Sequence, residues 1–123
     1  MVRGVWIEIG LWLPDHPARL AESGLASHCR RALVEPQETA PEIAVTTAGA
    51  IDGNLARAGV ELPQLHHGVD FTTWAVLDAA VRRAREIRIG LEDTFALPDA
   101  RRAASNAALV AAAAERYAVS PSG

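Results

Sequence analysis

Short stretches in which hydrophobic and polar residues alternate recur along the chain, and each is followed by a stretch with helical periodicity. The alternating stretches predict strands at 5–11, 29–35, 62–67 and 86–91. The others predict helices at 15–20, closed by Gly24, and at 41–57. They also predict a helix to about 84 that Thr72 or Thr73 caps, and a last helix to about 117 that Ser105 or Asn106 caps. Strands that alternate with helices are typical of a parallel sheet covered by helices. The sequence therefore predicts a single α/β domain of four consecutive βα units over residues 1–123, with residues 119–123 frayed.

Each predicted strand has one apolar face and one more polar face. In the last strand, Ile87 and Ile89 alternate with Arg88 and Gly90. We expect the polar residues of all strands to share one face: Glu8, Glu35, Gln64, His66, Arg88 and Glu92. Because buried parallel sheets are usually apolar on both faces, a polar face with charges near strand ends favours half of a (β/α)8 TIM barrel over an open sheet. Each residue taken singly could equally be an ordinary charge at a strand end.

Composition narrows the possible functions. The 123 residues carry a net charge of -3 without a basic stripe, so nucleic acid and anionic membranes are not expected partners. No apolar run approaches the length of a membrane span, and a cytoplasmic location fits a chain with one cysteine, Cys29. All 12 basic residues are arginine, which excludes Schiff-base lysines and the P-loop lysine.

Two motifs near the C-terminus resemble a known family. Residues 88–93 read Arg-Ile-Gly-Leu-Glu-Asp, and Ser-Asn-Ala follows at 105–107. This combination resembles the C-terminal signature of the β-keto acid cleavage enzymes, and the 63–68 stretch and the helix containing Trp74 are similar to one branch of that family. The resemblance implies a zinc-dependent (β/α)8 barrel that couples a β-keto acid with acetyl-CoA and releases acetoacetate and a new CoA ester. It further implies that Glu92 is a metal ligand and that Arg88 and Asp93 together form the base that generates the enolate.

The sequence departs from the family in one respect. The family's other zinc ligands form a His-x-His pair on an early strand, and this chain has no such pair. Its strands resemble the last four of eight, so we expect a C-terminal half that is inactive until it self-associates or meets a complementing N-terminal half. His66 and His67 should face opposite ways and cannot both bind one metal, unless the strand ends at Leu65. Two alternatives remain: a non-catalytic half-barrel assembly module, or an unrelated metal-dependent barrel lyase or aldolase.

Overall fold

The computed structural model describes residues 6–118 and contains one parallel sheet of four strands in chain order. The strands are β1 (Ile7–Leu11), β2 (Cys29–Val34), β3 (Gln64–His66) and β4 (Glu86–Ile87). The helices are α1 (His16–Ser23), α2 (Pro41–Arg57), α3 (Thr73–Arg82) and α4 (Asn106–Ala118), with short 3-10 turns η1 (Leu25–His28) and η2 (Asp70–Thr72). The predicted α/β half-barrel arrangement is confirmed. The predicted start of the first strand at Val5 and the predicted frayed end at 119–123 lie outside the described residues.

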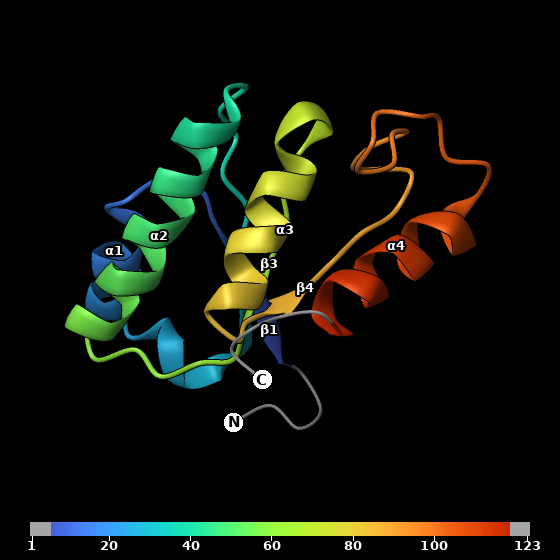
Figure 1. The fold of residues 1–123 in the computed structure, drawn as a ribbon. Coiled ribbons are helices and arrows are strands. Elements are labelled where there is room, and N and C mark those ends of the chain that lie inside the picture. The colour runs from blue at the N-terminus through green and yellow to red at the C-terminus, as the bar shows by residue number, and fades with distance from the viewer. Residues whose placement is uncertain (1–5, 119–123) are drawn as a thin grey trace.

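Helices α2 and α3 lie side by side against one face of the sheet, and α4 packs against α3 beyond β4 (Figure 1). The larger core cluster lies between the sheet and α2 and includes Leu11, Val34, Ile51 and Leu55. A smaller cluster joins α3 to α4: Leu77, Val81 and Ala113. No helix of the described residues is long and apolar enough to cross a membrane.

The register of β3 places its side chains differently from the prediction. Ala32 pairs with Gln64 and Val34 pairs with His66, and paired residues of a parallel ladder project to the same face. Gln64 and His66 therefore lie on the helix-facing side, buried to 6% and 0% exposure. The prediction that these two residues share the polar face is wrong, and Leu65 lies there instead.

This reversal has a physical reason in the helix layer. Alternation along a strand shows which residues share a face, but not which face the helices cover. Asp52 of α2 and Arg85 after α3 supply polar partners on the covered side. Gln64 and His66 can be buried there because their polar groups find partners.

Element ends follow local chemistry in most places. Gly24 ends α1 with φ 74, as predicted, because a left-handed residue is most easily glycine. The Ser105 Oγ accepts a hydrogen bond from the Ala108 N–H at 3.2 Å, which confirms Ser105 as the cap of α4. Strand β4 is shorter than predicted, since only the three-residue β3 lies beside it.

Candidate functional site

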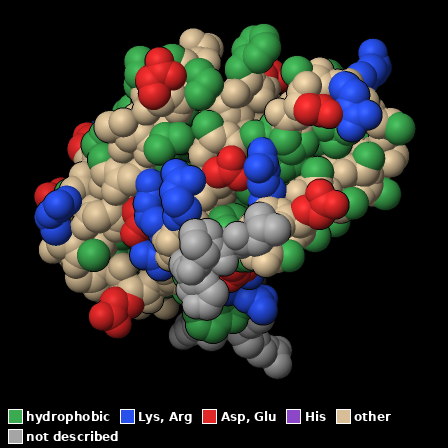
Figure 2. Space-filling model, viewed as in Figure 1, with side chains coloured by type: hydrophobic (Ala, Val, Ile, Leu, Met, Phe, Trp, Pro, Cys, Tyr) green, Lys and Arg blue, Asp and Glu red, His purple; other side chains and the backbone are tan. Residues whose placement is uncertain are grey.

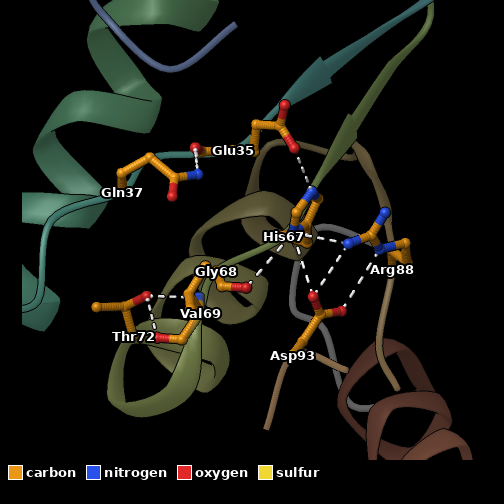
Figure 3. A network of polar contacts seen from close by, with 8 residues as sticks. All are labelled: Glu35, Gln37, His67, Gly68, Val69, Thr72, Arg88 and Asp93. Atoms are coloured by element: carbon orange, nitrogen blue, oxygen red, sulfur yellow. Dashed lines mark hydrogen bonds and ion pairs between the residues drawn. The ribbon is translucent and has the colours of Figure 1, made fainter. Parts of the chain in front are cut away.

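Four side chains from three consecutive strand ends meet at the carboxyl edge of the sheet (Figure 3). Glu35 follows β2, His67 follows β3 and Arg88 follows β4, while Asp93 lies in the turn after Arg88. All parallel strands end at this edge, so side chains far apart in sequence are brought together. His67 and Asp93 are each 4% exposed.

Arg88 holds Asp93 through two hydrogen bonds. The Arg88 Nη2 lies 3.0 Å from Asp93 Oδ1, and Nε lies 3.4 Å from Oδ2. The hydrogen bond to Asp93 raises the pKa of Arg88, against the opposing effect of burial and with help from the charges of Glu92 and Glu35. The pair therefore holds the Asp93 carboxylate in a fixed orientation in an almost fully buried position.

His67 connects this pair to Glu35. Its Nε2 lies 2.9 Å from Glu35 Oε2, and because a carboxylate only accepts, this nitrogen donates. Its Nδ1 lies 3.6 Å from Asp93 Oδ1 and 3.5 Å from Arg88 Nη2. The imidazole thus links two carboxylates and a guanidinium in one network.

Two glycines that the sequence reasoning missed allow this packing. A Cβ at Gly10 of β1 would collide with the Glu35 carboxylate, which lies across the strand. A Cβ at Gly68 would stand 2.7 Å from Thr72 Oγ1 and 2.8 Å from its backbone, so Gly68 lets the η2 turn fold against the end of β3. The signal in the sequence is a glycine inside a strand and another directly after one.

Thr72 serves this turn rather than capping α3. Its hydroxyl accepts from the Val69 N–H at 2.9 Å and donates to the Val69 carbonyl at 3.0 Å. No side-chain cap forms at the start of α3, so the predicted capping role is wrong for Thr72. The local reason is that the hydroxyl's hydrogen bonds go to the Val69 backbone instead.

Glu8 shares the polar face but lies away from the cluster. It pairs with Arg31 at 3.1 Å, and Arg31 also reaches Glu86 at 3.6 Å. These residues stand near the amino ends of the strands, so Glu8 does not join the site at the carboxyl edge. The sequence reasoning did not predict the pairing role of Arg31.

Glu92 also stays outside the network. Its side chain is exposed, and its carboxylate folds over Gly90, where an added Cβ would lie 2.5 Å from Oε2. The charge of Glu92 helps to raise the pKa of Arg88, but no hydrogen bond joins Glu92 to the described residues of the cluster.

Gln64 and His66 belong to a second polar cluster on the helix-facing side. The Arg85 Nη2 and Nε donate to the two Asp52 oxygens at 2.7 and 2.8 Å, and Gln64 links Asp52 to His66. Burial lowers the pKa of His66 to about 4, assisted by the charges of Arg83 and Arg85 and opposed by Asp52. Burial would raise the pKa of Asp52, but the Arg85 hydrogen bond and charge lower it overall.

Comparison with protein families matches the model of the beta-keto acid cleavage enzymes to residues 46–119, more than half of the chain. The chain belongs to this family. A comparison with curated proteins found no match. The matched region holds His67, Arg88, Glu92 and Asp93, whereas Glu35 precedes it.

The described residues of this family member contain no group that could form a zinc site by itself. Among residues 6–118, no three His, Cys, Asp or Glu side chains are grouped so that they could hold a metal ion. Both nitrogens of His67 face partners of the network, and His66 lies on the opposite face of the sheet. Glu92 offers an exposed carboxylate that forms no hydrogen bond or ion pair with the described residues.

Proposed function

We propose that this chain is the C-terminal portion of a β-keto acid cleavage enzyme that condenses a β-keto acid with acetyl-CoA to give acetoacetate and a new acyl-CoA. The observation that carries the proposal is the buried Asp93 carboxylate, paired with Arg88 at the carboxyl edge of a parallel sheet, inside the region that matches the family. Active sites of (β/α)8 barrels lie at this edge.

Asp93 is the proposed base, and Arg88 is its positioning partner. The reaction must begin by removing a proton from the carbon between the keto and carboxylate groups, and a carboxylate can accept that proton. The Arg88 guanidinium orients the Asp93 carboxylate through its two hydrogen bonds. His67 and Glu35 fix the other side of this pair.

The bond changes then balance without a redox step. The α-carbon attacks the thioester carbonyl of acetyl-CoA, a C–C bond forms, and the C–S bond breaks to release the thiolate. The thiolate attacks the original keto carbon, and the bond from that carbon to the α-carbon breaks. The electron pair returns to the α-carbon, which regains the proton from Asp93, and acetoacetate and the new CoA ester leave.

We further propose that the site is completed from outside this chain. Glu92 would contribute one carboxylate to a zinc ion, whose chemistry when bound is to polarise the keto and carboxylate oxygens of the substrate. The remaining ligands would come from a complementing N-terminal half. The support for this step is that Glu92 is exposed at the carboxyl edge while the other described residues form no metal site.

Proton exchange tests the role of Asp93 without needing acetyl-CoA. The chain is combined with the complementing N-terminal half and incubated with zinc and a β-keto acid in deuterated water. Deuterium at the α-carbon is followed by NMR. Asp93→Asn keeps the shape of the side chain but should slow exchange by about 100-fold or more. Glu8→Gln, a change on the same face near the amino ends, should leave the rate unchanged.

Two results would count against the proposed function. One is a wild-type exchange rate equal to that of buffer even when the chain is combined with the complementing N-terminal half, which would favour the non-catalytic assembly module. The other is an Asp93→Asn rate equal to the wild-type rate. Circular dichroism of each variant checks that its fold is retained.

A further inference from the structure

A pocket of about 600 Å³ lies between the start of α3 and the loop of residues 94–102. Its walls include Phe71, Trp74, Phe95, Leu97, Pro98 and Arg102. Hydrophobic side chains gather between α3 and this loop, with basic side chains beside them at the upper right of Figure 2. The volume is that of a small-molecule site rather than of a flat protein-docking surface.

Aromatic rings form the walls and remain available to a ligand. Phe71 is 88% exposed and Phe95 is 60% exposed, which is unusual for phenylalanine. Trp74 is held in place because its Nε1–H donates to the Ala96 carbonyl at 2.8 Å, which ties the loop to α3. The pocket therefore offers flat π-faces on a fixed frame, a surface on which another planar ring can stack.

A basic side chain completes the pocket. The Arg102 guanidinium carbon lies 6.0 Å from the centre of the Phe95 ring. Arg102 forms no ion pair with any residue of the described part of the chain, whereas its neighbour Arg101 pairs with Asp99. An exposed guanidinium beside aromatic rings can bind a phosphate while the rings hold a base.

The pocket adjoins the proposed catalytic site. The Asp70 N–H donates to the Asp93 carbonyl at 2.6 Å, and Thr94, which lines the pocket, follows Asp93 directly. A ligand seated in the pocket therefore contacts the same turn that carries the proposed base.

We infer that this pocket binds a purine nucleotide, with the base stacked between Phe71 and Phe95 and a phosphate held by Arg102. This inference rests on the proposed function, because the nucleotide end of an acyl-CoA co-substrate is a ligand of this class. It assigns to these residues the binding of the co-substrate and no part in the bond-making steps.

Binding is tested on the chain itself, without turnover. Adenosine 3′,5′-bisphosphate and adenosine are titrated separately while the indole N–H signal of Trp74 is followed by NMR, with the Trp12 signal as an internal reference at the end of β1. Both probes should shift the Trp74 signal. Arg102→Gln should weaken binding of the bisphosphate about tenfold and leave adenosine binding within about twofold. Phe95→Leu should weaken both.

The matched control is Arg101→Gln, which removes a neighbouring arginine that does not line the pocket and should retain wild-type affinity. Equal losses for the two arginine variants, or no Trp74 shift at millimolar probe, would overturn the inference. A change of association state in Phe71→Leu with unaltered nucleotide affinity would also overturn it and assign the rings to a protein contact. Nucleotide binding in a chain that fails the deuterium-exchange experiment would leave this inference standing and the proposed function rejected.

Discussion

At the scale of single residues, His66 and His67 are neighbours in sequence with different surroundings. His67 joins Glu35, Arg88 and Asp93 at the carboxyl edge, and His66 lies among Gln64, Asp52 and Arg85 under the helices. The His66 Nε2 donates to Gln64 Oε1 at 2.9 Å, while its buried Nδ1 has no hydrogen-bond partner among the described residues. A second proton on His66 would place a positive charge in a buried site near Arg83 and Arg85. Burial and these two charges therefore disfavour protonation of His66 in the folded chain.

The low pKa of His66 predicts that the free energy of unfolding falls with acidification over a defined pH range. Since the pKa of His66 is about 4 in the folded chain and 6.5 in the unfolded chain, only the unfolded state gains this proton between these values. The contribution of neutral His66 to the free energy of unfolding is complete above pH 6.5. It falls by up to about 3 kcal/mol as the pH drops to 4. Urea unfolding of wild type and His66→Gln at pH 7 to 4 measures the difference.

The expected result is a steeper loss of unfolding free energy in the wild type than in His66→Gln across this window. Asp52 has a lowered pKa, so its contribution to the free energy of unfolding is lost only at a pH below this window. Asp52 therefore does not account for the difference between wild type and His66→Gln. His28→Gln, which replaces an exposed histidine, serves as the control because His66 is still present. Parallel pH profiles for wild type and His66→Gln would show that burial of His66 does not drive the effect.

At the scale of the elements, Gly24 and Gly53 differ in whether the backbone conformation requires glycine. Gly24 ends α1 in the left-handed region with φ 74, and a Cβ there would meet no atom within 4 Å. Gly53 lies inside α2, where an added Cβ would be 3.4 Å from the Arg57 Nη1, the end of a flexible side chain. Only the first of these positions needs glycine.

Alanine substitutions should therefore shift stability in opposite directions. Gly24→Ala should cost about 1 kcal/mol, because an L side chain is strained at positive φ even without a clash. Gly53→Ala should gain about 0.5–1 kcal/mol by restricting the unfolded chain in a helical position. Thermal unfolding by circular dichroism compares the two midpoints. A shift in the same direction for both variants would contradict the assigned backbone roles.

At the scale of the whole molecule, the sheet face opposite α2 and α3 sets the tendency to associate. This inner face carries Glu8, Arg31, Leu33 and Leu65, and the two leucines pair in register and are only half-buried. In an eight-stranded barrel these positions point into the packed interior. A sheet of four strands has two open edges, β1 and β4, and lacks the opposing side chains.

We predict that the chain self-associates through this inner face when no complementing half is present. Leu65→Asp should weaken association by about 100-fold or more, because a carboxylate would be buried without a partner. Ile43→Asp, on the exposed side of α2, is the matched control and should associate as the wild type does. Sedimentation equilibrium measures both. A monomeric wild type, or equal association of Leu65→Asp, would contradict this prediction.

The order and type of the elements could be predicted from the sequence because they depend on local periodicity and end signals. The range 41–57 for α2 agrees with the structure, as do the end of α1 at Gly24 and the cap at Ser105. The pairing of Arg88 with Asp93 also follows from local chain geometry, since one tight turn separates them. The family motif singled out the same two residues.

Only the tertiary structure decided which side chains share a site. The register between β2 and β3, together with the partners that α2 and Arg85 supply, directs Gln64 and His66 toward the helices and leaves His67 to join Glu35. The aromatic pocket likewise depends on the loop after Asp93 folding back onto α3 through Trp74. The sequence by itself determined the elements, because those depend on neighbours along the chain, and the resemblance to the family singled out Arg88 and Asp93. The sequence did not determine the face of β3 or the pocket, because both depend on how separate elements pack.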